Sequence, residues 1–512
     1  MSRALRPPAL ALVAALLPAA CGGGGEPRTN VVLIVVDTLR ADHVLDPDGL
    51  VSTPNLDALA ADGALFERAY THTSWTLPSH TALFSSRPPH ETGVTLNSQL
   101  VPADLPLVAE WLGARGYATR AVHSLISLFP VQPGGGLDRG FDTFVDSMDM
   151  GYARAPEVTA QVTPVLSELA ASDQPFFLFL HYSDPHEPYH AYGTAGTPGE
   201  LVLNDEVIGR QENIAEPETI ATRATLAPGA NRLEFRTAGE VVPRVVSVVG
   251  PTGELELAFG RADDGQAFGT VMNDTGAALE VDVTFYGHEL PDEAESRRRY
   301  VLEIEHLDRW LGSVCDELSR LGLYEESLIV LTSDHGEGLG DHGMLSHGLS
   351  VFDELLHVPL VIKAPAAHPA RPALEARRGE LARHVDLVPT MLSLLDLPAL
   401  PGQTGVSLVE PAERVLEAEM HYPLEADQYA LFDGRWKLIW APDTGRYVLF
   451  DLASDPSETH DVYAERAPQL EGWRDRLRAM AERLAQTDVG LSPDLPPEVA
   501  EQLEAVGYVG HR

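Results

Sequence analysis

The chain has 512 residues, more than one hydrophobic core usually accommodates, so two or three domains are expected. Acidic residues outnumber basic ones by 76 to 36, which gives a formal net charge of −40 at pH 7. This charge argues against nucleic acid or an anionic membrane surface as a partner, and it indicates a solvated acidic exterior. The two cysteines, Cys21 and Cys315, are too few for a disulfide framework.

The N-terminal segment has the features of an export signal. Two arginines precede an apolar run at residues 9–17, and small residues precede Cys21. The run is too short to span a bilayer, so we expect a signal peptide at residues 1–21. The segment looks like a bacterial lipoprotein signal, with Cys21 lipidated and residues 22–28 as a flexible tether. The protein is therefore expected to be exported and lipid-anchored in the cell envelope, in the periplasm or at the cell surface, with no other membrane contact.

Three continuous apolar runs are each followed by acidic residues or histidines. The runs cover residues 30–36, 175–180 and 327–332, and they lead to Asp37, to Asp184 and His186, and to Asp334 and His335. Such runs are typical of buried strands in a parallel sheet, whose carboxyl ends carry ligands. An adjacent aspartate and histidine offer one oxygen and one nitrogen, which suits a transition metal better than calcium. A capping aspartate in a turn is the structural alternative for Asp37 and for Asp334.

A polar segment at residues 74–80 leads into an apparent helix with Pro78 in its first turn. Thr76 would then lie at the helix N-terminus, where unpaired amides and the helix dipole favour an anion. A hydroxyl in that position can attack a bound oxyanion ester once its proton is removed. The structural alternative is that Thr76 only caps the helix.

Residues 74–94 resemble the signature of the sulfatases, in the alkaline phosphatase superfamily. That signature reads Cys-x-Pro-Ser-Arg, then a short helix ending in Gly-Arg, then Pro-His-x-x-Gly-Val. The matching residues are Pro78, Ser79, Arg87, Pro89, His90, Gly93 and Val94. Thr76 replaces the cysteine and His80 replaces the arginine. Sulfatases oxidise the cysteine to formylglycine, which a threonine with its branched Cβ cannot form, so the chemistry must use Thr76 directly or be absent.

The resemblance spans nearly the whole chain outside the leader and one insert, and it implies the site residues. The implied metal ligands are Asp37, Thr76, Asp334 and His335, holding one divalent ion (zinc, manganese or calcium, with a transition metal favoured). The implied catalytic residues are Thr76, His80, His186 and His347. Of these, His186 and His347 would act on the leaving group and the ester oxygens. A second metal on Asp184, His186 and His347 is the alternative to the one-metal site.

Two positions depart further from the family. Thr38 stands where many sulfatases have a second aspartate, which weakens a calcium site built on paired carboxylates. Where sulfatases grip the sulfate with a Lys-Trp-His triplet, this chain has His123 and Ser124, and the lysine is missing.

The expected fold class is α/β, an alkaline-phosphatase/sulfatase-like sandwich with a central mostly parallel sheet, an inserted β-sandwich and a small C-terminal α+β subdomain. The two parts of the α/β domain are expected at residues 29–190 and 293–410. Residues 191–292 contain short alternating segments at even spacing, which favours an inserted β-sandwich. One of these segments, 254–259, is predicted as a single strand. Residues 411–512 are expected to form the C-terminal subdomain and a helical tail.

The sequence therefore predicts a metal-dependent hydrolase of phosphate monoesters or diesters, phosphonates or sulfate esters, acting on small molecules or glycans through Thr76. An unmodified threonine favours phosphorus, whereas the surrounding sequence looks more like the sulfatases. Two alternatives stay open: a sulfuric ester hydrolase that works without formylglycine, and a non-catalytic surface binding protein on the same fold. Loss of the cysteine, arginine and lysine supports the last, and retention of the strand-end ligands argues against it.

Overall fold

The computed structural model describes residues 29–44, 49, 51–124, 136–146, 153–187, 189, 199–211, 220–237, 241–251, 253–255, 257–261, 267–289, 292–421 and 427–487. The predicted signal peptide, the tether and Cys21 lie outside these residues. Within the described ranges, no helix has both the length and the apolar character needed to cross a bilayer.

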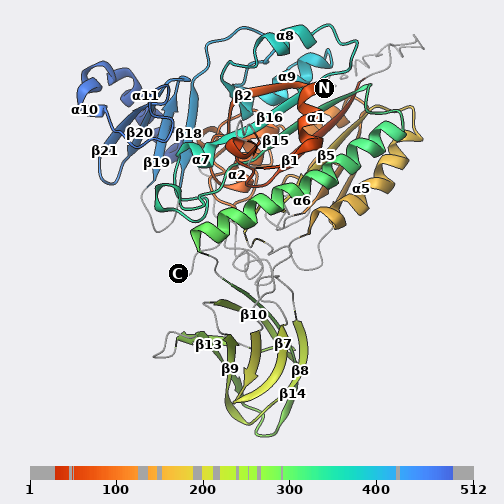
Figure 1. The fold of residues 1–512 in the computed structure, drawn as a ribbon, viewed down its shortest axis with the longest axis vertical. Coiled ribbons are helices and arrows are strands. Elements are labelled where there is room, and N and C mark those ends of the chain that lie inside the picture. The colour runs from red at the N-terminus through yellow and green to blue at the C-terminus, as the bar shows by residue number, and fades with distance from the viewer. Residues whose placement is uncertain are drawn as a thin grey trace, which may run out of the picture.

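An eight-stranded sheet forms the centre of the molecule, in the order β17-β2-β16-β15-β1-β5-β3-β4 (Figure 1). Its parallel core consists of β15 (Ser327–Ser333), β1 (Asn30–Val36), β5 (Phe176–Tyr182), β3 (Ala118–His123) and β4 (Thr143–Asp146). Antiparallel β16 (His357–Lys363) links β15 to β2 (Ala64–Tyr70), and β17 (Ala382–Arg383) pairs with β2 at the edge. The prediction of a mostly parallel central sheet is confirmed.

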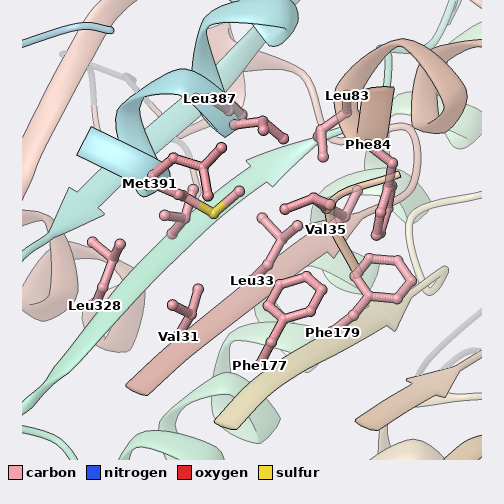
Figure 2. Packing of buried hydrophobic residues seen from close by; sticks show 14 of the residues in the cluster. Val31, Leu33, Val35, Leu83, Phe84, Phe177, Phe179, Leu328, Leu387 and Met391 are labelled. Atoms are coloured by element: carbon pink, nitrogen blue, oxygen red, sulfur yellow. The ribbon is translucent and has the colours of Figure 1, made fainter. Parts of the chain in front are cut away.

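The side chains of β1 alternate between two apolar cores, although the whole strand is hydrophobic. Val31, Leu33 and Val35 face one core, which Figure 2 shows with Phe84, Phe179 and Met391 packed against them. The helices of this core are α2 (Thr76–Ser85), α4 (Val108–Gly113), α8 (Arg371–Ala376) and α9 (Leu387–Leu394). Val32, Ile34 and Val36 face the other core, with α1 (Pro54–Asp62), α5 (Ala155–Ala170) and α6 (Glu293–Arg320). Burial on both faces explains the continuous apolar run. The first polar residue after the run therefore lies at the edge of the sheet.

Two antiparallel sheets form a lobe that lies below the central sheet in Figure 1. One sheet, in the order β11-β10-β14-β8, contains β8 (Ile220–Leu226), β10 (Val241–Gly250), β11 (Gly253–Glu254) and β14 (Leu279–Glu289). The other, in the order β12-β13-β9-β6-β7, contains β6 (Gly199–Leu203), β7 (Glu206–Gln211), β9 (Gly229–Thr237), β12 (Leu257–Arg261) and β13 (Ala267–Asn273). Buried residues of both sheets, Leu201, Leu233, Val248, Val271 and Val283 among them, form one core, as expected for a β-sandwich. The single strand predicted over 254–259 is wrong, because β11 and β12 belong to different sheets.

The C-terminal sheet has the order β18-β19-β20-β21. Its strands are β18 (Leu416–Met420), β19 (Gln428–Phe432), β20 (Trp436–Ala441) and β21 (Arg446–Asp451). Leu477 and Met480 of α11 (Glu471–Gln486) pack on one face, and Tyr70, Val351 and Leu356 of the main domain pack on the other. The shorter helices are α3 (Pro89–Thr92), α7 (Asp353–Leu356) and α10 (Tyr463–Arg466).

A buried ion cluster joins this sheet to the segment that carries Thr76. His90 in α3 is 1% exposed, with Nδ1 3.2 Å from Glu419 Oε1 and Nε2 3.4 Å from Glu417 Oε2. Burial by itself lowers the pKa of His90, but the charges of Glu419 and Glu417 and their hydrogen bonds outweigh burial and raise the pKa to about 10. A charged His90 therefore clamps α3 to the sheet at neutral pH.

We expect His90→Gln to lower the free energy of unfolding by about 3 kcal/mol at neutral pH, because two buried carboxylates lose a charged partner. The pKa of His90 is raised on folding, so its contribution is complete below 6.5 and is lost as the pH rises through about 10. Urea unfolding at neutral pH and near pH 10 measures both effects. A difference between wild type and variant that does not shrink with pH would show that His90 carries no charge here. Arg483→Gln is the control, because its pair with Glu91 is half-exposed and is expected to change stability by about 0.5 kcal/mol or less.

Candidate active site

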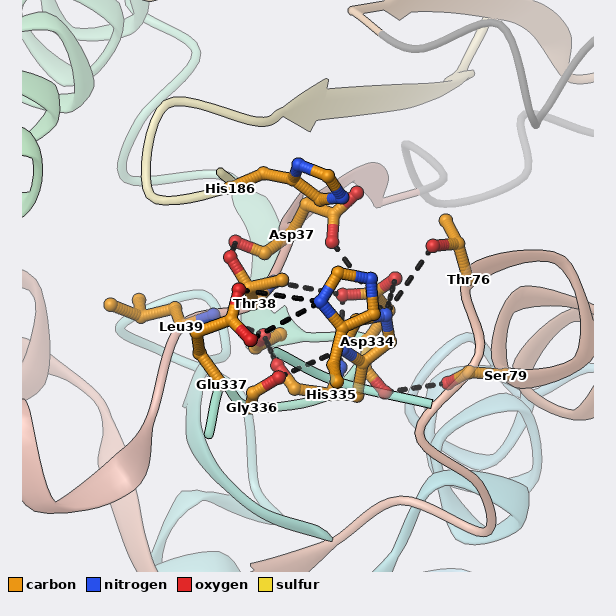
Figure 3. Close-up of polar contacts among 12 residues, drawn as sticks. Asp37, Thr38, Leu39, Thr76, Ser79, His186, Asp334, His335, Gly336 and Glu337 are labelled. Carbon is orange, nitrogen blue, oxygen red and sulfur yellow. Dashed lines mark hydrogen bonds and ion pairs between the residues drawn. The ribbon is translucent and has the colours of Figure 1, made fainter. Parts of the chain in front are cut away.

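The carboxyl ends of β1, β5 and β15 meet at one edge of the central sheet, because these strands are adjacent and parallel. Asp37 follows β1, Asp184 lies just beyond β5, and Asp334 and His335 follow β15. All four side chains are fully buried. Figure 3 shows Asp37, Asp334, His335 and Thr76 gathered at this edge.

Asp37, Asp334 and His335 place one ligand atom each within 4.8 Å of the others. His335 Nε2 is 3.7 Å from Asp37 Oδ1 and 3.5 Å from Asp334 Oδ2. Thr76 Oγ1 lies 3.3 Å from the same nitrogen. His335 Nδ1 donates to the carbonyl of Gly336 at 2.9 Å, and since a carbonyl only accepts, Nε2 carries the lone pair. The structure thus brings together the four residues predicted as metal ligands.

Among the described residues, most carboxylate oxygens of this cluster have no hydrogen-bond donor that would offset the cost of burying their charge. Both oxygens of Asp37 and Oδ2 of Asp334 are buried with no hydrogen-bond partner in the described part of the chain. Burial, with the charges of Asp334 and Glu337, raises the pKa of Asp37 well above its usual range, and burial raises that of Asp334 to about 6. Two such carboxylates require a positive charge beside them.

The donor set fits a divalent transition metal, since it combines carboxylate oxygens, an imidazole nitrogen and a hydroxyl. Burial and the charge of His347 lower the pKa of His335 to about 3, so its imidazole is neutral, which is the form that binds a metal. Its Nδ1–H is held by a backbone carbonyl, as in many metal-bound histidines.

Thr76 is the first residue of α2 and is fully buried. The helix N-cap is Trp75, so the reading of Thr76 as a cap is wrong. The amide of Leu77 donates to Asn97 Oδ1 at 2.8 Å, and Pro78 has no N–H, so two first-turn amides are unavailable to an anion. The hydroxyl of Thr76, rather than the helix N-terminus, is therefore the feature presented to the cluster.

Two backbone features hold the strand-end loops in place. A Cβ at Gly336 would collide with the carbonyl oxygen of Glu354, so the loop after β15 requires glycine there. Thr38 has φ 57°, which is strained for a β-branched residue, and its amide donates to Asp334 Oδ1 at 3.3 Å. Thr38 therefore positions a ligand through its backbone, where many sulfatases supply a second carboxylate.

His186 and His347 lie beside this cluster. The ring of His347 is 4.6 Å from that of His335 and 4.9 Å from that of His186, measured between centroids. Its Nδ1 is 3.3 Å from both carboxylate oxygens of Glu337, which is fully buried. Burial lowers the pKa of His347 to about 4 and raises the pKa of Glu337 to about 7. Burial, together with the charge of His347, lowers the pKa of His186 to about 3. Glu337 was not predicted as a site residue, although it follows Asp334 and His335 by only a few positions.

The side chain of Asp184 forms its hydrogen bond with the start of a helix. Its Oδ1 accepts from the amide of Ala155 at 3.1 Å, at the start of α5. Among the described residues, the clusters able to hold a metal are Asp37–Asp334–His335 and His80–His181–Asp334. The alternative set of Asp184, His186 and His347 is not one of them.

His80 lies one turn beyond Thr76 in α2, fully buried, with Nδ1 3.7 Å from Asp334 Oδ2. Its ring centroid is 5.1 Å from that of His181 in β5. His181 Nε2 is 3.8 Å from Asp37 Oδ2, and its Nδ1 is 3.0 Å from Ser124 Oγ. His181 received no role from the sequence because it directly follows the apolar run predicted over 175–180, whereas the observed β5 extends to Tyr182 and includes it. A titratable residue directly after a run of buried Phe and Leu is the signal that marks it.

The chain is similar to known proteins over most of its length. Residues 29–397 match the family model of the sulfatases. The chain is 24% identical to arylsulfatase K of Xenopus laevis over 498 residues, which is 89% of this chain and 83% of the relative. It is 26% identical to the choline-sulfatase of Rhizobium meliloti (strain 1021) over 470 residues, 84% of this chain and 81% of the relative.

Two solved structures share the fold. The phosphonate monoester hydrolase of Agrobacterium radiobacter has a TM-score of 0.60 at 20% identity, over 89% of this chain and 96% of that one. The structure of BT4656 in complex with its substrate, D-glucosamine-2-N,6-O-disulfate, has a TM-score of 0.59 at 18% identity, over 90% of this chain and 99% of that one. The predicted fold class is confirmed.

Proposed function

The chain belongs to the sulfatase family, hydrolases of sulfuric or phosphoric esters, and we propose that it cleaves phosphorus esters with the hydroxyl of Thr76 as nucleophile. The observation that carries the proposal is the position of Thr76 Oγ1, 3.3 Å from His335 Nε2. The hydroxyl lies beside the unpaired oxygens of Asp37 and Asp334, where a nucleophile can be activated. A non-catalytic binding protein has no physical need for buried carboxylates without hydrogen-bond partners.

A divalent cation held by Asp37, Asp334, His335 and Thr76 would supply the Lewis acidity that lowers the pKa of an alcohol. The Thr76 oxygen bonds to phosphorus, the bond from phosphorus to the substrate oxygen breaks, and the proton of the Thr76 hydroxyl ends on the leaving oxygen, which departs as an alcohol. The imidazole of His347 is neutral and directs its Nδ1–H to the Glu337 carboxylate, so the lone pair of Nε2 can take up that proton and pass it to the leaving oxygen. Water then cleaves the phospho-threonine and restores the hydroxyl.

Phosphate esters or phosphonates are proposed ahead of sulfates for a chemical reason. Threonine cannot give the aldehyde on which formylglycine sulfatases depend, whereas an alcohol can attack phosphorus directly. The fold also accommodates phosphonate monoester hydrolysis in the Agrobacterium radiobacter protein. The substrate is proposed to be a small molecule or a glycan, the kinds of compound named for choline-sulfatase and for BT4656. The leader sequence supports the further proposal that the enzyme is exported and anchored through Cys21.

The test is a panel of matched nitrophenyl esters: sulfate, phosphate monoester, phosphate diester and phosphonate. Each is assayed with the zinc- and manganese-reconstituted protein and with Thr76→Val, which keeps the side-chain shape and removes the hydroxyl. We expect Thr76-dependent cleavage of one or more phosphorus esters, faster than cleavage of the sulfate. Cleavage of sulfate alone would replace this proposal with a sulfatase that works without formylglycine. No cleavage, with no bound metal, would overturn it in favour of a binding protein.

A further inference from the structure

Asp334 belongs to a second cluster of ligand-type residues. His80, His181 and Asp334 each offer one ligand atom, and these atoms lie within 4.8 Å of one another. The three residues come from α2, from β5 and from the end of β15, and all are fully buried. The sequence predicted His80 as a catalytic residue in place of the arginine of the sulfatase signature, and it gave His181 no role.

Each imidazole of this cluster has one ring nitrogen engaged and one buried without a partner. His80 Nδ1 lies 2.8 Å from the carbonyl oxygen of Thr76, and because a carbonyl only accepts, Nδ1 carries the proton. His80 Nε2, His181 Nε2 and Asp334 Oδ2 are all buried with no hydrogen-bond partner among the described residues. A proton on His80 Nε2 would be buried without an acceptor, so the ring is a neutral lone-pair donor rather than a substitute for the arginine charge.

The arrangement matches the surroundings of metal-bound histidines. Such a histidine usually directs its other ring nitrogen to a backbone carbonyl, a carboxylate or another polar group that fixes the ring. The Thr76 carbonyl does this for His80, and Ser124 Oγ, 3.0 Å from Nδ1, does it for His181. Ligand atoms of a tetrahedral zinc ion with bonds of about 2.1 Å lie about 3.4 Å apart, so modest inward movement of these side chains is sufficient.

The two clusters are contiguous. Asp334 Oδ2 lies 3.5 Å from His335 Nε2 and 3.7 Å from His80 Nδ1. The second of these contacts is to the protonated nitrogen of His80. Asp37 instead approaches the unpartnered nitrogen of His181, with Oδ1 3.7 Å from His335 Nε2 and Oδ2 3.8 Å from His181 Nε2. The two carboxylates therefore approach His335 as well as His80 and His181, and one cation leaves part of this donor set unused.

We propose that His80, His181 and Asp334 bind a second divalent transition metal, zinc or a similar ion, next to the one held by Asp37, Asp334, His335 and Thr76. The inference rests on the proposed function, since it makes the same centre dinuclear. Ser124 is a positioning residue that orients His181. Paired ions can clamp both the attacking and the leaving oxygen of a displacement at phosphorus, which is the chemistry proposed for Thr76.

The test is the zinc content of the chelator-stripped and reconstituted full-length chain, measured by elemental mass spectrometry. Wild type is expected to hold two equivalents, and His80→Gln and His181→Gln one each. His72→Gln is the matched control, because His72 is another buried histidine, bonded to the Glu417 carbonyl, and it is expected to leave both equivalents in place. Two equivalents retained in His80→Gln and His181→Gln would overturn the second site.

The same measurement separates this inference from the proposed function. One equivalent in wild type, lost in His335→Gln and kept in His181→Gln, would overturn the second site and leave the Thr76 proposal standing. Loss of zinc in His181→Gln with full retention in His335→Gln would support the second site and overturn the metal-activated Thr76 proposal. Should the glutamine variants fail to fold, Ser124→Ala keeps every ligand and is expected to weaken the affinity for one of two zinc ions by about 10–100-fold in competition titrations. Unchanged affinities for both ions in that variant would contradict the role of Ser124 and of the site it orients.

Discussion

Replacing Thr76 with alanine is expected to lower kcat on phosphorus esters by at least about 10³-fold, because the oxygen that bonds to phosphorus is removed. Asp37, Asp334 and His335 remain, so the variant should still bind metal. The substitution deletes a few buried atoms and is expected to destabilise the fold by about 1–2 kcal/mol. Steady-state kinetics on the preferred nitrophenyl ester, with metal content and unfolding measured in parallel, checks the three statements together.

Two further substitutions make this result specific to the hydroxyl. Thr76→Ser keeps a primary hydroxyl and should retain activity within about 100-fold of wild type, since only the methyl group that orients the oxygen is lost. Thr76→Val keeps the shape and should be as inactive as alanine. Wild-type rates in the valine variant would show that Thr76 is not the nucleophile. A serine variant as inactive as alanine would show that the hydroxyl alone does not explain the effect.

Removal of metal is expected to lower the melting temperature by several degrees, because Asp37 and Asp334 then face each other without a counter-charge. An ion present at about 1,000 times its Kd stabilises the folded chain by about 4 kcal/mol. Thermal unfolding of the chelated and zinc-loaded protein at about pH 8, above the raised pKa of Asp334, which is about 6, gives the difference.

In the metal-free state, the Asp334→Asn variant is expected to be more stable than wild type. The asparagine Oδ1 can still accept from the amides of Thr38 and His335, while the repulsion between the carboxylates disappears. We therefore expect the metal-free variant to melt above metal-free wild type and to gain nothing from zinc. Asp184→Asn is the control, because Asp184 bonds to the start of α5, and it should keep the full response to zinc. An Asp334→Asn variant that zinc stabilises as much as wild type would contradict the assignment of Asp334 as a ligand.

The sequence allowed the position of the first cluster to be predicted for a simple physical reason. Strands buried on both faces appear as continuous apolar runs, and the polar residue that ends each run lies at the edge of the sheet. Asp37 and Asp334 were located in this way, and the motif around residues 74–94 added Thr76.

What could not be predicted depends on contacts between distant elements. His80 and His181 meet only because α2 packs on the face of the sheet to which β5 contributes, and no local pattern encodes that contact. The pairing of Glu337 with His347 depends on the path of the loop after β15. In the insert, short strands of different sheets follow one another with a break of two residues, so hydrophobic alternation alone merged β11 with β12.

The β-sandwich lobe is inserted between β5 and α6, and none of its strands joins the ladder of the central sheet. A segment placed in this way can lengthen, shorten or change its surface without altering the register of β1, β5 and β15. The positions of Asp37, Asp334 and His335 therefore do not depend on the length or the surface of the lobe. Insertions or deletions in the lobe are thus expected to leave the spacing of the reactive groups at the strand ends unchanged.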